Sequence, residues 1–299
     1  MNDLWYILPE IFLLLTSLLL LPMINLQKSI IMLFAIVAAI AIICMQPHYH
    51  SHLIFHDLIA ISPFTQYLKT IVLALTAMVL LMMTVTTHSK YNKDLPILIA
   101  LSTIGMLSLI SSHDLLSMYM AIELQSLPMY VMAAINRKSL HSSEAGVKYF
   151  ILGALASGIL LYGISMIYGF AGSTNFTDLT QIFRSGDLSL GLLVGIILII
   201  SAFGFKIAAF PFHMWIPDVY QGSPTIVTTF FAAVPKVAVI GFMIRIFDYE
   251  LVNIKLQQVF ILLAILSMII SALGALRQTN NKRIASNINT CCSFMLTSS

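Results

Sequence analysis

The chain has 299 residues, of which 59% are hydrophobic and only 9% are charged. Soluble domains carry about 25% charged residues because their surfaces must be hydrated. A soluble globular fold is therefore excluded, and the mean hydropathy of +0.96 places most of the chain in a lipid bilayer. The 15 basic and 12 acidic residues are too balanced and too scattered to indicate nucleic-acid binding. The cysteines, Cys44, Cys291 and Cys292, are too few for a disulfide framework or a four-ligand metal site.

Apolar stretches long enough to cross a bilayer recur along the chain. A spanning helix needs about 20 mainly apolar residues, and nine such runs are separated by charged, proline or small polar residues. In chain order they run from Ile7 to Ile24, Lys28 to Met45, Gln66 to Thr87, Leu95 to Ser112, Leu115 to Ile135, Glu144 to Phe170, Ser189 to Ile216, Thr225 to Phe247 and Leu256 to Leu276. This pattern predicts an all-α polytopic membrane protein.

Both ends of the chain depart from this pattern. The first run has Asp3 and Glu10 where a signal peptide would have a basic region, and no small-residue cleavage site follows it, so we expect a retained helix. After Gln278 the hydropathy falls, and the final 22 residues hold no run long enough to span. We expect this tail to be an external stub or the product of a broken reading frame.

Basic residues in the predicted loops are unevenly distributed. Loops after odd-numbered spans hold eight of them, namely Lys28, Lys90, Lys93, Arg137, Lys138, Arg277, Lys282 and Arg283, and the opposite loops hold three, Arg184, Arg245 and Lys255. By the positive-inside rule the N-terminus is expected to face out. Lys69 and Lys148 lie within spans about one turn from a helix end, and we expect both to snorkel to the interface.

Three ionisable residues lie deeper in predicted spans, where an unpaired charge is costly. Glu123 is eight residues into the fifth span, Lys206 is in the seventh, and Lys236 is in the middle of the eighth. Each is therefore a candidate for proton translocation. The alternative is a Glu–Lys ion pair that only holds helices together, and it stays open at this point.

A proline accompanies each of these residues. Pro128 follows Glu123 by five residues, Pro211 follows Lys206 by five, and Pro235 immediately precedes Lys236. Because proline removes the hydrogen bond to the carbonyl four residues back, free backbone acceptors are expected near the buried charges, as in the ion sites of transporters. The alternative is that these prolines have no such role, since membrane helices also tolerate proline. His213 is seven residues beyond Lys206, which is two helical turns, so we expect it on the same face as a candidate proton relay.

Other motifs carry less information. Three histidines alternate in the loop after the second span, His48, His50 and His52, so a strand would place them on one face as candidate metal ligands. Only Asp57 is nearby to complete a set of metal ligands, which favours solvated loop histidines instead. No nucleotide, flavin or iron–sulfur motif occurs. The segment GALASG, at residues 153–158, is expected to allow close helix packing.

Several long stretches resemble a known family. EAGVKYFILGALASGILLYGISMIYG (144–169) and GFKIAAFPFHMWIPDVYQGSPT (204–225) resemble subunit N of bacterial proton-translocating NADH:quinone oxidoreductase, respiratory complex I, called subunit 2 in mitochondria. Residues 206–218 resemble the wider antiporter-like superfamily, and DVYQG at 218–222 points to subunit N rather than its L and M relatives. LLSMYMAIELQSLPMYVMAA (115–134) and VPKVAVIGFMIRIF (234–247) agree, and the resemblance extends to about Arg283.

The resemblance implies roles for individual residues. Glu123 matches the family's fifth-helix carboxylate, Lys206 the lysine of the broken seventh helix, and Lys236 the central lysine of the eighth. Lys148 matches the lysine of a Lys-Tyr-Phe motif and has a weaker implied role. The family implies that the Glu–Lys pair tunes the protonation of the lysine and that the central lysine passes a proton toward a lysine in the twelfth helix.

The resemblance also implies how the chain is organised. The family's fold has inverted five-helix repeats, helices four to eight and nine to thirteen, among about fourteen helices. Accordingly, 1–94 are expected to form helices one to three, 95–247 the antiporter-like repeat, and 248–299 helix nine and a polar tail. Since only one helix of the second repeat and no twelfth-helix lysine are found, we expect a C-terminally truncated subunit.

The implied function is that of a non-redox membrane-arm subunit that couples electron transfer from NADH to quinone with proton translocation. No cofactor is expected in this chain; NADH, FMN, iron–sulfur clusters and quinone belong to partner subunits. The implied partners are subunits of the M, K and J types and the lipid bilayer. The expected location is the bacterial inner membrane, or alternatively the mitochondrial inner membrane. The competing interpretations are an independent cation/proton antiporter subunit and a non-functional truncated remnant.

Overall fold

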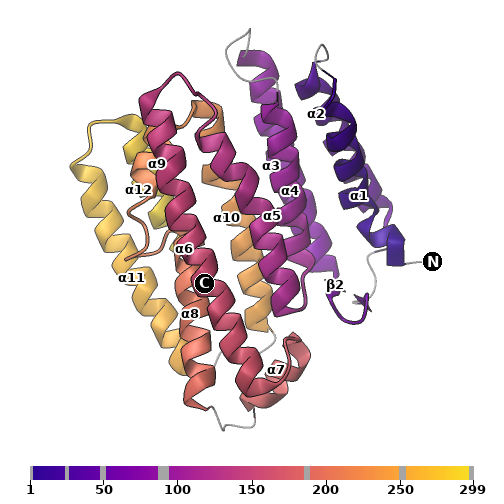
Figure 1. Ribbon diagram of the computed structural model, residues 1–299, viewed down its shortest axis with the longest axis vertical. Helices are drawn as coiled ribbons and strands as arrows, with labels where there is room; N and C mark the ends of the chain where they lie inside the picture. The colour runs from indigo at the N-terminus through magenta and orange to yellow at the C-terminus, as the bar shows by residue number, and fades with distance from the viewer. Residues whose placement is uncertain are drawn as a thin grey trace.

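The computed structural model describes residues 3–23, 27–47, 52–86, 94–184, 189–248 and 254–295, which form a bundle of helices (Figure 1). In chain order the elements are α1 (Asp3–Leu20), α2 (Lys28–Met45), β1 (His52–Ile54), β2 (Ile59–Ile61), α3 (Pro63–Thr86), α4 (Leu95–Ser111), α5 (Leu115–Ala133), α6 (Leu140–Ala171), α7 (Phe176–Arg184), α8 (Leu190–Ile207), α9 (Ile216–Gly222), α10 (Thr225–Asp248), α11 (Ile254–Leu276) and α12 (Asn281–Met295). The all-α prediction is confirmed, because within these residues only the antiparallel β1–β2 hairpin forms a sheet.

Each predicted span overlaps a helix. Within the described residues, α2, α3, α6, α8 and α10 are long and apolar enough to cross a membrane by length and composition. Shorter apolar segments, of 10–17 residues, lie in α1, α4 and α11. The seventh predicted span is not one continuous helix, since α8 ends at Ile207 and α9 begins only at Ile216.

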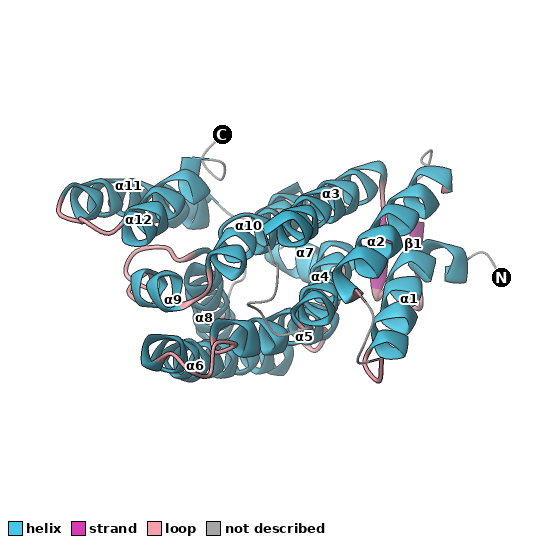
Figure 2. Cartoon of the chain, turned by 90° about the horizontal axis from the view of Figure 1, so that it is seen from above, coloured by secondary structure: helices cyan, strands magenta, loops and turns pink. Residues whose placement is uncertain are grey.

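The helices that carry the candidate residues lie together. Seen from above, α4, α5, α6, α8 and α10 form a central group, with α1 and α2 to one side and α11 and α12 to the other (Figure 2). Helix α4 packs along α5, α6 packs along both α5 and α8, and α10 packs against α3, α4 and α8. Glu123 on α5, Lys206 on α8 and Lys236 on α10 therefore belong to one packed unit.

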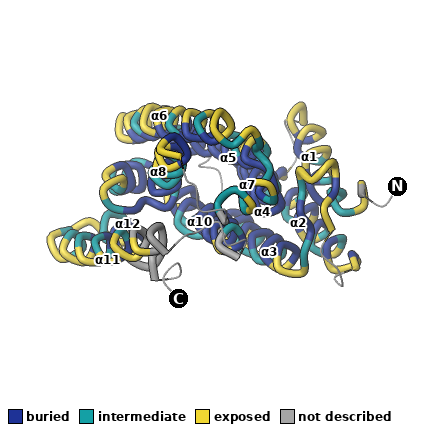
Figure 3. Tube along the Cα trace, turned by 90° about the horizontal axis from the view of Figure 1, so that it is seen from below, coloured by how far each residue is buried: buried dark blue, intermediate teal, exposed yellow. Residues whose placement is uncertain are grey.

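The burial pattern fits a membrane protein. Buried residues face the inside of the central group and exposed ones lie on the outward sides of the helices (Figure 3). Tyr220, Phe230 and Phe242 are among the largest fully buried side chains, whereas the apolar Leu155 and the aromatic Tyr162 of α6 are 62% and 59% exposed. Hydrocarbon chains are as apolar as leucine, so such outward faces are stable in lipid.

Two helices lie outside the predicted spans. Helix α7, with 9 residues, is too short to cross a bilayer and buries Phe176 and Leu179. Helix α12 lies in the tail, and the expectation of an external stub is wrong because α12 packs against α11, α9 and α10. Hydropathy missed it because its buried side chains are polar: Ser286, Asn287 and Thr290 are 0%, 7% and 3% exposed.

Candidate functional site

Helix α5 holds Glu123 and Ser126 one turn apart on the same face. Its start is fixed by Asp114, whose carboxylate accepts hydrogen bonds from the backbone N–H groups of Leu116 (2.8 Å) and Ser117 (3.2 Å). The helix continues through Pro128 to Ala133. The acidic residue and the serine are thus presented together by one capped, continuous helix.

Lys206 meets this face from the last turn of α8. Its Nζ donates to Ser126 Oγ at 2.6 Å, and Ser126 Oγ in turn donates to the backbone oxygen of Ile122 at 2.5 Å. Glu123 acts on Lys206 electrostatically, but its buried Oε1 has no hydrogen-bond partner among the described residues. The lysine therefore bonds to a neutral hydroxyl and not to the carboxylate, which leaves one oxygen of Glu123 available.

The chain breaks its helix immediately after Lys206. Ala208 takes a left-handed conformation with φ of 66°, the backbone N–H of Ala209 donates to the oxygen of Gly204 at 2.7 Å, and helix does not resume until Ile216. Trp215 Nε1 donates across the break to the backbone oxygen of Phe205 at 3.2 Å. The predicted interruption near Lys206 is confirmed, and a non-glycine residue held at positive φ is a feature found at functional sites.

His213 lies inside this break. The expectation that it follows Lys206 on one helix face is wrong, because the residues between Ile207 and Ile216 are not helical. Its ring lies 5.8 Å from that of Phe210, centroid to centroid, and its Nδ1 is buried with no hydrogen-bond partner among the described residues. The histidine is thus placed by the loop, and its part in proton transfer stays a prediction.

Two glycines set how closely the central helices approach. A Cβ on Gly105 would lie 2.4 Å from the backbone nitrogen of Gln125, so α4 and α5 touch backbone to backbone beside the site. Ser102 Oγ donates to the Gln125 oxygen at 3.0 Å in the same region. A Cβ on Gly153 would lie 2.2 Å from the Tyr130 hydroxyl, whereas nothing lies within 4 Å of Gly158. The predicted packing role of GALASG is confirmed for its first glycine only.

Lys236 stands near the middle of α10 and is 7% exposed. Its Nζ donates to the backbone oxygen of Asn289 on α12 at 3.2 Å. The amide of Asn289 donates to the Tyr220 hydroxyl (3.1 Å) and to the backbone oxygen of Ala232 (2.9 Å). The tail helix therefore supplies an oxygen to the central lysine, and a buried polar network links α9, α10 and α12.

Lys148 forms a separate charged network at the N-terminal end of α6. Its Nζ lies 2.7 Å from Asp218 Oδ2 and 2.9 Å from Glu144 Oε1, and Arg283 donates to the other Asp218 oxygen at 3.1 Å. Arg283 Nε also donates to Gln221 Oε1 at 2.5 Å. The side chain of Lys148 is 43% exposed, which agrees with its predicted place near a helix end.

The candidate metal ligands do not form a site in the described part of the chain. His48 and His50 lie outside the described residues, and His52 in β1 is exposed. Among the residues that the structure describes, no group of three or more His, Cys, Asp or Glu side chains is positioned to hold a metal ion.

Several partners of the predicted residues had not been found by sequence reasoning. Ser126 and Asn289 carry no signal of their own, while Asp218 was noted only within a motif and Arg283 only as a loop cation. Each gains its role from a contact with a residue more than 50 positions away. The structure brings Glu123 and Lys206 to one site, and it gives Lys236 and Lys148 separate partners. Chemically, a lysine bonded to a hydroxyl beside an available carboxylate oxygen is able to take up and release a proton.

The part of the chain that is similar to known proteins includes the residues of the site. A family model described as "NADH:quinone oxidoreductase/Mrp antiporter, TM" matches residues 112–288, more than half of the chain. The matched range begins just before the Asp114 cap and includes Glu123, Lys148, Lys206 and Lys236.

Individual relatives are similar over most of the chain. NADH-quinone oxidoreductase subunit N 1 of Rhizobium meliloti (strain 1021) is 46% identical over 229 residues, which are 75% of this chain and 47% of that protein. NADH-ubiquinone oxidoreductase chain 2 of Marchantia polymorpha is 48% identical over 242 residues, covering 78% and 49%. A chain in the structure of respiratory complex I from Thermus thermophilus with bound aureothin matches with a TM-score of 0.78 and 26% identity, covering 97% and 62%. The chain spans about half the length of the curated relatives that it matches.

Proposed function

We propose a function for a chain that belongs to the NADH:quinone oxidoreductase/Mrp antiporter transmembrane family, as the match over residues 112–288 establishes. The chain is a membrane-arm component of a proton-translocating NADH:quinone oxidoreductase. It carries protons and performs no redox step itself. The observation that carries the proposal is the contact of Lys206 Nζ with Ser126 Oγ at 2.6 Å, one turn from Glu123, at a break in α8.

The proton-handling step follows from this geometry. When the Glu123 carboxylate approaches, it favours the protonated form of Lys206, and when it withdraws or is neutralised, the lysine is free to pass its proton on. Ser126 holds the amine in place in both states, because its own hydrogen is given to Ile122 and its lone pairs face Lys206. Lys236, bonded to the oxygen of Asn289, is the next group in the proposed order.

The Lys148 network is proposed as the contact of this unit with the aqueous phase. Asp218 joins Lys148 of α6 to Arg283 of α12, and all three side chains are between about a third and a half exposed. Groups that remain in contact with water exchange protons readily, whereas Lys206 and Lys236 lie deeper in the packed helices. The predicted weaker role of Lys148 is therefore an exchange role at the surface.

Redox groups and further subunits are proposed to lie elsewhere. NADH, FMN, iron–sulfur clusters and quinone are assigned to partner subunits, and the charge change that drives Glu123 is assigned to neighbouring membrane-arm subunits of the M, K and J types. The relatives named NADH-quinone oxidoreductase subunit N and the chain of respiratory complex I support this assignment. The apolar outward faces of α6 and α11 suit either lipid or such a neighbour.

The proposed location is a bacterial inner membrane, with a mitochondrial inner membrane as the alternative, and the N-terminus on the outer side. The basic residues of the α5–α6 connection support this orientation by the positive-inside rule. A membrane-impermeant thiol reagent is expected to label Asp57→Cys, in the hairpin, in intact cells, and Lys138→Cys only after permeabilisation. The reverse labelling pattern contradicts the orientation.

The function is tested in the complete oxidoreductase, carried in inverted membrane vesicles. Lys206→Ala and Glu123→Gln are expected to keep NADH oxidation measurable while proton uptake falls by roughly tenfold or more. Lys138→Ala is the matched control, because Lys138 is an exposed loop lysine that makes no contact with the site. Full proton uptake in Lys206→Ala vesicles at an unchanged amount of subunit refutes the proposal. An activity that persists without any NADH-oxidising partner indicates an independent antiporter instead.

A further inference from the structure

A second buried pair of opposite charges lies outside the central group. Glu10 of α1 and Lys69 of α3 are joined by an ion pair of 2.6 Å between Oε1 and Nζ, and their side chains are only 9% and 6% exposed. The expectation that Lys69 snorkels to the interface is therefore wrong: its partner lies inside the bundle. Neither residue belongs to the range that the family model matches.

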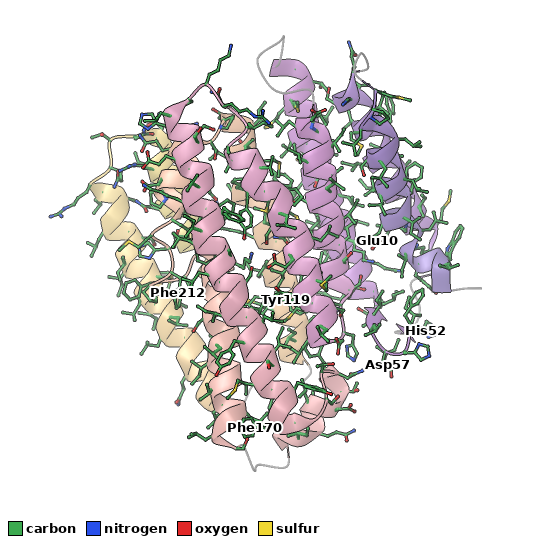
Figure 4. The ribbon with its side chains drawn as sticks, viewed as in Figure 1. Glu10, His52, Asp57, Tyr119, Phe170 and Phe212 are labelled. Carbon is green, nitrogen blue, oxygen red and sulfur yellow. The ribbon has the colours of Figure 1, made fainter. Side chains whose placement is uncertain are left out.

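The pair borders a cavity of about 100 Å³ whose lining is mostly apolar but includes the polar residues Glu10, Lys69, Ser108, Ser111, Ser112 and Ser117. The strand residues Ile59 and Ile61 also line it, so it lies where α1, α3, α4 and the start of α5 meet the hairpin. Figure 4 places Glu10 inside the bundle, on the side toward the hairpin that carries His52 and Asp57. At roughly 30 Å³ for each molecule, this space holds about three waters.

The polar residues of the lining supply several hydrogen-bond acceptors. Glu10 Oε2 is buried and has no hydrogen-bond partner among the described residues. Each of the four serine hydroxyls already donates its hydrogen to a backbone carbonyl, at distances between 2.8 and 3.3 Å. A hydroxyl that donates its hydrogen still has lone pairs, so these serines are able to accept hydrogen bonds from a donor in the cavity. A buried carboxylate oxygen without a donor is costly, and this demand points to a ligand.

We propose that Glu10, Lys69 and the four serines form a hydrated proton-binding site separate from the Glu123–Lys206 site. The ligand is a cluster of water molecules that carries an exchangeable proton to and from the face of the bundle that bears the hairpin. In the transfer step an O–H bond of a hydronium ion breaks, the proton forms an O–H bond with Glu10 Oε2, and a neutral water remains. Lys69 stays protonated throughout, so the protonated site carries one positive charge, on the lysine. This inference rests on the proposed function in proton translocation.

The charge balance favours water and a proton over a metal cation. Lys69 already neutralises Glu10 at 2.6 Å, so the site offers a metal ion no net negative charge. The other ionisable groups on the surrounding elements are Asp3 and Tyr6 on α1, His52, His56 and Asp57 in the hairpin, Tyr67 on α3, His113 and Asp114 between α4 and α5, and Tyr119, Glu123 and Tyr130 on α5. Of these, Tyr6 lines the cavity itself. A proton needs only the acceptors that the serines and Glu10 supply.

Hydration is tested first, with Ag⁺ as a small thiol-reactive probe on the intact complex. The background carries Cys44, Cys291 and Cys292 replaced by serine, and the one thiol left in this subunit is counted after detergent unfolding and separation of the subunit from its partners. Ser111→Cys places a thiol at the cavity, and Ser102→Cys is the matched control on the same helix, since both serines are buried. We expect Ser111→Cys to react roughly tenfold faster, because thiolate forms only where water reaches. Equal, slow rates overturn the proposal.

Function is tested by separating the charge from the packing. Glu10→Gln or Lys69→Met alone leaves a buried charge without its partner, so each is expected to lower the amount of assembled complex. The double variant Glu10→Leu with Lys69→Met removes both charges and is expected to restore the amount of assembled complex. If the pair binds a translocated proton, proton uptake per NADH oxidised stays several-fold below wild type in the assembled double variant. If the pair is only structural, assembly and uptake recover together, and the inference is overturned.

Lys206→Ala distinguishes this inference from the function on which it rests. Loss of uptake in Lys206→Ala together with full uptake in the double variant overturns the second site alone. Full uptake in both overturns the proposed function as well. A dependence of uptake on Na⁺ that the double variant abolishes overturns the assignment of a proton as the ligand. If the double variant does not assemble, the Ag⁺ measurement alone decides whether the cavity is hydrated, because the cysteine variants used in it keep both Glu10 and Lys69.

Discussion

Gly105 of α4 is the position where one added carbon atom disturbs the candidate site most directly. A Cβ there lies 2.4 Å from the backbone nitrogen of Gln125, 2.8 Å from its Cα and 2.9 Å from the backbone carbon of Leu124. These atoms belong to the backbone of α5 and cannot rotate away. Gly105→Ala therefore forces α5 away from α4, and with it Glu123 and Ser126.

The size of the displacement follows from the contact distance. Ordinary contacts of a Cβ begin at 3.4 Å, so relief of the 2.4 Å contact moves α5 by about 1 Å relative to α4. Misplacement of reacting groups by 1 Å costs up to about 100-fold in rate, whereas overpacking costs about 1–3 kcal/mol of stability. We expect Gly105→Ala to lower proton uptake per NADH oxidised far more than it lowers the amount of assembled complex.

The assay compares two alanine substitutions of helix glycines in inverted vesicles. Proton uptake is followed with a pH-sensitive dye, NADH oxidation by absorbance, and the amount of subunit by immunoblot. Gly158→Ala is the matched control, since nothing lies within 4 Å of its Cβ position and alanine favours helix over glycine by about 1 kcal/mol. If Gly105→Ala vesicles take up protons as fast as Gly158→Ala vesicles at equal subunit content, the reasoning from helix contact is refuted.

Three further predictions concern the partners of the site. Ser126→Ala removes the acceptor of Lys206, and we expect a loss of about 1–3 kcal/mol in stability together with slower proton uptake; a melting temperature equal to wild type contradicts this. Asp218→Asn is expected to shift the melting temperature little, because ion pairs as exposed as the one with Lys148 contribute about 0–1 kcal/mol, while it slows uptake in the same vesicles. His113 is buried, and burial together with the nearby guanidinium of Arg245 lowers its pKa from 6.5 to about 4. Between these pH values the unfolded chain binds a proton at His113 that the folded chain does not, so the free energy of unfolding falls by up to about 3 kcal/mol as the pH drops. His113→Gln should therefore flatten the decline in melting temperature on acidification.

The spans and the buried charges were predictable because both depend on local composition. An apolar run of about 20 residues has few alternatives to a membrane helix, and an ionisable residue inside it stands out at once. Glu123, Lys206 and Lys236 were found this way, and the first of these lysines indeed sits in the last turn before the break in α8. Glu10 was noted only as evidence against a signal peptide, and its partner on α3 is 59 positions away, so its place in a buried pair needed the fold.

The polar tail was not predictable from hydropathy because the criterion assumes that a membrane helix buries apolar side chains. Helix α12 buries Ser286 and Thr290, and each hydroxyl bonds to a backbone carbonyl of its own helix, at 2.7 and 3.0 Å. Such serines and threonines are satisfied by their own helix, so they can be buried against neighbouring helices without a partner there. A window average counts these residues as solvated and predicts a loop.

The kind of partner given to each buried lysine suggests a division of work along the bundle. Lys206 donates to a serine hydroxyl, and Lys236 donates to a backbone carbonyl among its contacts. At Lys206 the printed contact is with a neutral hydroxyl, so exchange of its proton does not break a hydrogen bond to the Glu123 carboxylate. Lys69 instead bonds directly to a carboxylate, whose other oxygen, Glu10 Oε2, is buried with no hydrogen-bond partner among the described residues. A single lysine-to-glutamine comparison separates the arrangements: Lys206→Gln keeps a donor for the hydroxyl and should preserve assembly while abolishing uptake, whereas Lys69→Gln strands the Glu10 charge and should cost assembly first. Equal assembly of the two variants would contradict this division.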